Sequence, residues 1–214
     1  MEQFQIVFYT KEDGTQPARE FMDGLSQKMR TRFAKLIVLL REEGVKLRMP
    51  YSEYLKDGIF QIRAQQEGNI ARVLYFFWDG QKIVLTNGFT KKTQKTPPVE
   101  IERAKRYKAD YERRELTGMK RPVTFDEYLA EEMKNPAFKA EWDALEPEFQ
   151  IIRAIIEGRE ARRFSEEQLS EVTGISPAEI IRLEEGSANP TLTDLKRLAA
   201  GLGMTLRLDF QPIA

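Results

Sequence analysis

The residues best suited to chemistry gather in one lysine-rich stretch. Residues 86–98 read Thr-Asn-Gly-Phe-Thr-Lys-Lys-Thr-Gln-Lys-Thr-Pro-Pro, and they include Lys91, Lys92 and Lys95 but no carboxylate. Lysines with hydroxyl and amide neighbours can hold the phosphates of a polyanion by charge and hydrogen bonding. The alternative is a solvated loop between a strand and a helix, and this stretch alone does not separate the two.

Two arginines add to this positive charge. Arg63 and Arg72 each interrupt strongly apolar sequence, within residues 59–64 and 70–78. A charged residue inside a strand lies either on a solvated face or at a site. Because the turn between the two segments is short, we expect antiparallel neighbours in which the two arginines lie close together.

The hydrophobic pattern predicts the elements that would position these residues. The predicted strands are residues 4–9, 59–64, 70–78 and 82–89, which are rich in β-branched and aromatic side chains. The predicted helices are residues 15–25, 29–40 and 99–114, which have apolar residues at helical spacing. We therefore expect an α+β fold in which an antiparallel sheet carries helices on one face.

Three sequence blocks in this half are typical of a known family. They are residues 58–63, 71–76 and 88–97, the last followed by Glu-Ile-Glu-Arg-Ala at 100–104. With these blocks, residues 2–114 resemble the RelE/ParE superfamily of toxins, and within it the HigB-type branch. The resemblance implies a RelE-like antiparallel sheet and a small ribonuclease that cleaves messenger RNA, commonly on the ribosome.

The catalytic residues expected on this basis are the two arginines and the three lysines. RNA is cleaved when its 2′-hydroxyl attacks the adjacent phosphate, so the protein must orient the RNA, move protons and stabilise negative charge. A lysine crowded by other cations has a lowered pKa and can act as acid or base. Family members often carry a tyrosine or histidine near the end of this site. Here none follows Lys95 before Tyr107, which leaves the general acid unassigned and allows that this half only binds.

The chain contains no cysteine and no histidine. This excludes disulfides, thiolate chemistry, the usual zinc ligand and the usual general base. We therefore expect no metal and no cofactor. Since no apolar run reaches membrane-spanning length and the first residues do not resemble a signal peptide, we expect a cytoplasmic protein.

The zero net charge of the chain divides into two opposite halves. Residues 121–214 contain 11 Lys and Arg against 18 Asp and Glu, which leaves 23 against 16 of the total of 34 each in residues 1–120. We interpret this as a basic and an acidic domain that attract each other. The predicted boundaries are a toxin-like domain at 1–114, a linker or fusion junction at 115–122 and an antitoxin-like domain at 123–214.

Residues 124–149 predict two acidic helices with aromatic residues on one face. Thr124 begins the first helix with a capping box. Phe138, Trp142 and Phe149 can line either a core or a partner surface. We expect them to lie on the basic half and to block its phosphate site.

Residues 148–203 have the pattern of a helix-turn-helix. Two capping boxes begin at Ser165 and Ser176, with Gly174 in the turn between the helices and Ile180 as the buried anchor. This segment resembles the Xre-type helix-turn-helix family, and with the preceding helices it resembles HigA-type antitoxins. The resemblance implies binding to operator DNA.

The expected DNA contacts lie around the second helix of this motif. They are Gln168, Ser176, Ala178, Glu179, Arg182 and Asn189. A helix-turn-helix that serves mainly as a scaffold is the alternative. An acidic domain binds DNA weakly as a monomer, so we expect a homodimer. Apolar residues alternate along 204–211 and predict a strand that pairs with its copy in a second subunit.

Together these features predict a type II toxin–antitoxin module in one chain. The first half would be a ribosome-dependent messenger-RNA endoribonuclease, and the second half would neutralise it and act as an autorepressor. The alternative is a DNA-binding transcription regulator whose first half is a non-catalytic docking or sensing domain. A topoisomerase-directed toxin is a third possibility, since the superfamily includes such members.

Overall fold

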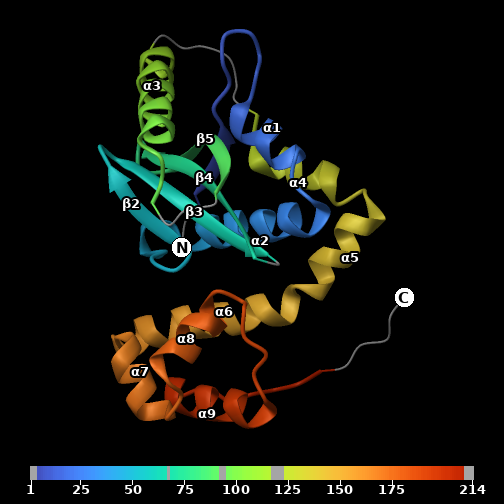
Figure 1. The fold of residues 1–214 in the computed structure, drawn as a ribbon, viewed down its shortest axis with the longest axis vertical. Helices are drawn as coiled ribbons and strands as arrows, with labels where there is room; N and C mark the ends of the chain where they lie inside the picture. The colour runs from blue at the N-terminus through green and yellow to red at the C-terminus, as the bar shows by residue number, and fades with distance from the viewer. Residues whose placement is uncertain (1–3, 67, 92–94, 117–122, 210–214) are drawn as a thin grey trace. The chain divides into compact units, whose positions relative to one another are not determined.

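The computed structural model describes residues 4–66, 68–91, 95–116 and 123–209. The chain divides into two compact units, Met1–Ala144 and Leu145–Ala214. Figure 1 shows a sheet with helices around it in the first unit and a group of helices in the second. The α+β fold class predicted from the sequence is therefore confirmed.

The first unit contains all the strands that the structure describes. They are β1 (Gln5–Phe8), β2 (Ser52–Lys56), β3 (Ile59–Gln66), β4 (Asn69–Trp78) and β5 (Lys82–Lys91). Its helices are α1 (Pro17–Asp23), α2 (Gln27–Glu43), the 3-10 helix η1 (Gly44–Lys46), α3 (Pro98–Glu115), α4 (Phe125–Glu132) and α5 (Pro136–Ala144). The sequence did not predict β2, because this edge strand reads Ser-Glu-Tyr-Leu-Lys and lacks a strongly apolar pattern.

The sheet has the strand order β1-β5-β4-β3-β2. Strands β2 to β5 form the predicted antiparallel meander, while β1 pairs with β5 in parallel. The turn residues Asp79 and Gly80 have φ values of 49° and 76°. This left-handed conformation matches the twist of the flanking strands and permits the tight β4–β5 hairpin.

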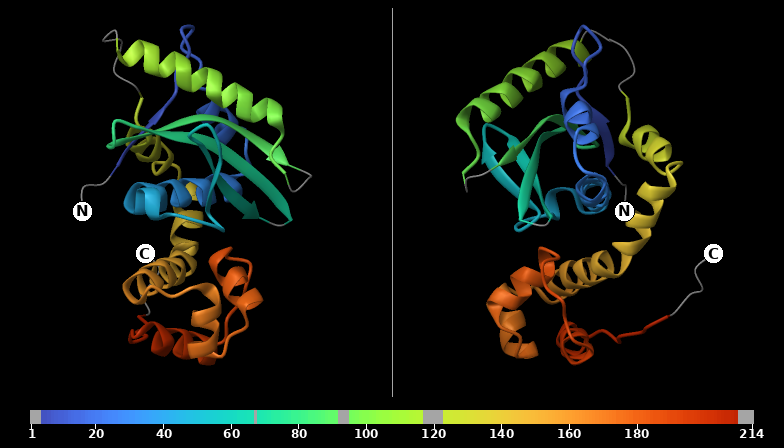
Figure 2. Two further views of the ribbon diagram at one scale, coloured as in Figure 1. Left: turned by 90° about the vertical axis from the view of Figure 1, so that its left-hand side faces the viewer. Right: turned by 45° about the vertical axis from the view of Figure 1, so that its right-hand side comes forward.

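Helices cover the sheet on both faces. Figure 2 shows α2 on one side of the sheet and α3 on the other. On the α3 side, Leu74 and Val84 of the sheet share a core with Ala104 and Tyr111 of α3. The expectation of helices on one face was incomplete, because the narrow apolar stripe of α3 is sufficient to cover the second face.

A short segment before α4 extends the sheet at its β1 edge. Thr124 forms an antiparallel bridge with Val7, and the backbone N–H of Phe8 donates to the carbonyl of Val123 at 3.0 Å. These bonds satisfy backbone groups of β1 that an edge strand would otherwise expose. α4 then packs on β1, and α5 packs on α2.

The compact units differ from the predicted domain boundaries. The sequence placed residues 123–214 in one domain, whereas residues 123–144 pack within the first unit. The reason is burial: Phe125 of α4 and Phe138 of α5 are both 0% exposed. Removing such side chains from water stabilises the fold by roughly 1.5–3 kcal/mol each.

The second unit consists of α6 (Glu146–Arg162), α7 (Glu166–Thr173), α8 (Pro177–Glu184) and α9 (Leu192–Leu202). Helices α7 and α8 form the helix-turn-helix, and Gly174 between them has a φ of 65°. The capping boxes at Ser165 and Ser176 are present as predicted, and Thr191 begins α9 with another. Leu169, Ile180 and Leu198 share the core of this unit.

The predicted strand at 204–211 is not formed within the described residues. Residues 204–209 follow α9 without regular structure, and residues 210–211 lie outside the described part. Among the described residues, this unit contains no other strand with which an extended segment could pair. In the part of the chain that the structure describes, no helix combines the length and apolarity needed to cross a bilayer.

Candidate nucleic-acid interfaces

Arg63 and Arg72 lie directly opposite each other in the β3–β4 ladder. Both are on the sheet face that α3 covers, since Leu74 of that core is two residues from Arg72. Arg72 is 6% exposed. Burial lowers the pKa of Arg72, and the charge of Arg63 lowers it further. Two adjacent guanidinium groups repel each other, so binding of an anion such as phosphate between them would be favourable.

A chain of hydrogen bonds connects Arg72 to the edge of the sheet. Arg72 Nη1 donates to Thr96 Oγ1 at 3.2 Å, and Thr96 Oγ1 donates to Gln61 Oε1 at 2.6 Å. Gln61 Nε2 donates in turn to Glu53 Oε2 at 2.5 Å. An ionised carboxylate only accepts hydrogen bonds, so Glu53 determines the direction of every bond in this chain. This series of hydrogen bonds therefore holds the Arg72 guanidinium in one orientation.

The sequence did not predict Glu53, Gln61 or Thr96 as site residues. Gln61 is two positions before Arg63 in the same strand and therefore shares its face, which is a signal that the sequence carries. Thr96 belongs to the lysine-rich stretch. Glu53 had no usable signal, because the strand that carries it was not predicted.

The structure locates the predicted lysines only in part. Lys91 ends β5, where its backbone pairs with Ile70. Its side chain and all of Lys92 lie outside the described residues. Lys95 is exposed and precedes Thr96, which contacts Arg72. Of the five predicted catalytic residues, the structure thus brings Arg63 and Arg72 together and places Lys95 next to Thr96, which is hydrogen-bonded to Arg72.

The lysine-rich stretch is anchored where α3 begins. Asn87 of β5 is 2% exposed, and its Nδ2 donates to Glu100 Oε2 at 2.9 Å. The same oxygen accepts from Arg103 Nη1 at 2.7 Å. Glu100 lies in the first turn of α3, where a carboxylate also interacts favourably with the helix dipole. These bonds tie the start of α3 to β5 beside the arginine pair.

The acidic helices contact the first 116 residues away from this pair. Arg41 Nη1 of α2 lies 2.5 Å from Asp126 Oδ1, and Arg30 Nη1 lies 3.4 Å from Glu132 Oε1. Lys35, which is 1% exposed, places its Nζ 4.3 Å from the centre of the Trp142 ring.

These contacts correct the expected position of the acidic helices. β1, on which α4 packs, is separated from β4 by β5, and Ile62 rather than Arg63 points to the α2 side of the sheet. The helices lie on the basic half as expected, but on its α2 and β1 side instead of on the arginine site.

The six residues expected to contact DNA are all exposed on the second unit. Two of them bind each other: Glu179 N donates to Ser176 Oγ at 3.3 Å, and Ser176 Oγ donates to Glu179 Oε2 at 2.8 Å. Gln168 Oε1 accepts from Ser165 N at 2.8 Å, and Arg182 Nη2 lies 3.9 Å from Glu179 Oε1. Ala178 and Asn189 complete the set.

A buried ion pair fixes α8 to α6. Glu184 is 2% exposed, and its Oε1 accepts from Arg159 Nη1 at 2.8 Å. Burial raises the pKa of Glu184 to about 7, although Arg159 acts in the opposite direction. Arg159 also lies 3.5 Å from Glu166 of α7. This arginine therefore links both helices of the helix-turn-helix to α6.

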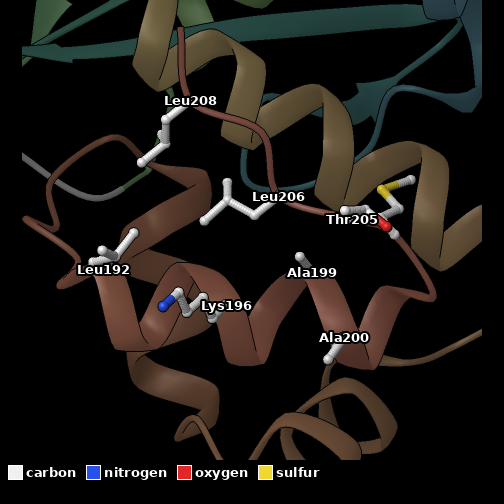
Figure 3. Close-up of a pocket in the computed structure, with 8 residues that line it drawn as sticks. Leu192, Lys196, Ala199, Ala200, Thr205, Leu206 and Leu208 are labelled. Atoms are coloured by element: carbon white, nitrogen blue, oxygen red, sulfur yellow. The ribbon is translucent and has the colours of Figure 1, made fainter.

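An open groove of about 450 Å³ lies between α9 and the segment that follows it. Figure 3 shows Leu206 above Ala199 of α9, with Leu192 and Lys196 along the same helix. Leu208 in its wall is 58% exposed. Among the described residues, acidic side chains form no cluster that could hold a metal ion.

Comparison with known proteins divides the chain in the same way. Residues 20–109 match the family model described as "Phage derived protein Gp49-like (DUF891)", and residues 155–208 match the model described as "Helix-turn-helix". An "Uncharacterized HTH-type transcriptional regulator" of Haemophilus influenzae (strain ATCC 51907 / DSM 11121 / KW20 / Rd) is 36% identical over 58 residues, which are 27% of this chain and 59% of that protein. The chain thus spans less than two thirds of the length of this relative. The chain therefore contains one region that is similar to the Gp49-like family and a second region that is similar to helix-turn-helix domains.

Proposed function

We propose that this chain is a type II toxin–antitoxin module in one polypeptide. Its HigB-type half is a messenger-RNA endoribonuclease that acts on the ribosome, and its HigA-type half neutralises this activity and represses its own operator. The observation that carries the proposal is the pairing of Arg63 with Arg72, in which Arg72 is held by hydrogen bonds that run through Thr96 and Gln61 to Glu53.

The arginine pair would act on the phosphate of the RNA. As the 2′-hydroxyl attacks, charge develops on the phosphate oxygens, and two guanidinium groups beside them stabilise it more than they stabilise the ground state. Glu53 is a carboxylate close to the pair and can accept the hydroxyl proton. Lys91, Lys92 and Lys95 would bind the flanking backbone or protonate the leaving 5′-oxygen.

Neutralisation would come from residues 123–144. These residues carry six Asp and Glu against two Lys. They contact Arg30, Lys35 and Arg41 on α2 and extend the β1 edge of the sheet. We propose that they hold the toxin half from this side, and that covalent linkage keeps their effective concentration high.

Expression of defined segments tests the proposal. Residues 1–116 should arrest growth and fragment messenger RNA, whereas residues 1–144 and the full chain should not. Arg72→Ala in residues 1–116 should abolish fragmentation. Arg106→Ala is the matched control, since Arg106 is an exposed arginine of α3 in the same domain. Intact RNA in cells that contain folded residues 1–116 would count against the nuclease.

The second candidate is a DNA-binding regulator with a non-catalytic docking domain. It is favoured by the relative described as a transcriptional regulator and by the lack of histidine. In this case residues 1–116 leave messenger RNA intact, while the full chain still binds its operator. The homodimer, the pairing of residues 204–211 between subunits and the cytoplasmic location stay predictions.

A further inference from the structure

The exposed side of α8 carries apolar residues beside one arginine and one glutamate. Ala178, Ile181 and Arg182 are exposed and are spaced three and four residues apart, so they share one face of the helix. Ile180 and Leu183 lie on the opposite face, in the core of the unit. Ile181 is 37% exposed, and it is one of the large apolar side chains that the second unit presents to solvent.

The polar groups at the start of α8 are already engaged. The hydroxyl of Ser176 accepts from the N–H of Glu179 and donates to its carboxylate, and Glu179 also accepts from the N–H of Ser176 at 3.4 Å. These bonds stabilise the first turn of the helix. Two polar residues that could otherwise read base edges are therefore directed toward the helix itself.

We infer that α8 reads its DNA site mainly through thymine methyl groups. In the major groove, an apolar side chain recognises the C5-methyl of thymine, whereas arginine recognises guanine. Ala178 and Ile181 supply the apolar contacts, and Arg182 supplies the donors. The inference rests on the proposed operator binding and specifies which bases that operator contains: thymines, with a guanine at or next to the base pair under Ile181.

The charge of the second unit favours the same conclusion. Residues 145–214 contain 8 Lys and Arg against 12 Asp and Glu. Few cations are available for phosphates, so the salt-dependent, sequence-independent part of binding is small. Contacts to base edges then carry a larger share of the affinity.

Replacing thymine by uracil tests this inference, because uracil lacks only the methyl group. Duplexes bound by the full chain are selected from a random pool, and each thymine of the selected site is replaced in turn. Loss of one buried methyl should weaken binding about fourfold at one or two positions. In Ile181→Ala, the effect of uracil should vanish at one of these positions.

Val172→Ala is the matched control, since Val172 is an aliphatic residue of α7 that is 51% exposed and faces Gly201 of α9. It should keep the full uracil effect.

Tight binding that is indifferent to uracil, or selected sites without thymine, would overturn the inference and leave operator binding intact. If no duplex is selected, operator binding fails as well. If Ile181→Ala weakens self-association but not DNA binding, the face is a protein interface and the inference is wrong.

Discussion

The two candidate nucleic-acid interfaces of this chain are held in place by different means. In the first unit, the bonds from Arg72 to Thr96, Thr96 to Gln61 and Gln61 to Glu53 join residues 24, 35 and 8 positions apart. In the second unit, the bonds between Ser176 and Glu179 join residues 3 positions apart. One interface depends on the packing of a whole sheet, and the other is organised within a single turn of helix.

The interfaces also differ in the groups that they offer. The first places two arginines side by side, one of them nearly buried, and would bind phosphate by charge. The second exposes aliphatic side chains beside one arginine. The hydroxyl of Ser176 and the carboxylate of Glu179 bind each other and cap the N-terminus of α8. Changes in the first unit should therefore affect distant residues, whereas changes in the second should stay local.

The largest expected effect is on the stability of the first unit. Phe138→Ala should lower its free energy of unfolding by about 3–5 kcal/mol, because the side chain is fully buried where α5 packs on α2. Trp78 and Trp142 are the two tryptophans of the chain, and both lie in this unit. Tryptophan fluorescence during urea denaturation therefore measures the unfolding of the first unit.

The control for this prediction is Val45→Ala, at a side chain that is 68% exposed. It should change the free energy of unfolding by less than about 0.5 kcal/mol. Hydrogen exchange of the α7 and α8 backbone amides measures the stability of the second unit. An equal loss of protection there would show that the effect is not confined to the first unit.

The next effect is a pH dependence of the second unit. The folded pKa of Glu184 is about 7, above its ordinary value of 4.5, so the folded state retains a proton that the unfolded state loses between these values. Stability should therefore fall as pH rises from 4.5 to 7, by about 3 kcal/mol at most, and then level off. Glu184→Gln should flatten this slope in hydrogen exchange of α8, and an unchanged slope would assign it to another group.

A smaller effect is expected on RNA cleavage. Thr96→Val removes the hydroxyl that links Arg72 to Gln61, so cleavage by residues 1–116 should slow about tenfold through loss of orientation. Thr90→Val is the control, because Thr90 is exposed and pairs with Ala71, on the other face of the sheet. DNA binding by the full chain should not change with either substitution. Equal rates for the two variants would show that the hydrogen-bond chain has no role in catalysis.

The smallest effect concerns the start of α8. Ser176→Ala should destabilise the second unit by about 1 kcal/mol, the usual contribution of an N-cap. Ser187→Ala, at an exposed serine after α8, should be nearly neutral. Thermal unfolding followed by helical circular dichroism separates the two. A change in the fluorescence of the first unit would contradict the local character of this contact.

Short-range features were predictable from the sequence of this chain. The capping boxes at Thr124, Ser165 and Ser176, the β4–β5 hairpin at Asp79 and the helix-turn-helix around Gly174 are all present. Each depends on residues close together in the chain, three positions apart in the capping boxes, so residue type and spacing are enough to specify it. The opposition of Arg63 and Arg72 follows in the same way from one short turn.

Which distant residues meet depends on the packing of the whole fold. The links from Arg72 to Thr96 and Glu53, the parallel pairing of β1 with β5 and the packing of α5 on α2 join segments far apart in the chain. The same holds for residues 204–209, whose alternating pattern favours a strand, although the described residues of this unit contain no strand with which it could pair. An apolar or charged pattern indicates that a side chain needs a packing or hydrogen-bond partner. Which residue becomes that partner depends on the surfaces that the fold brings together.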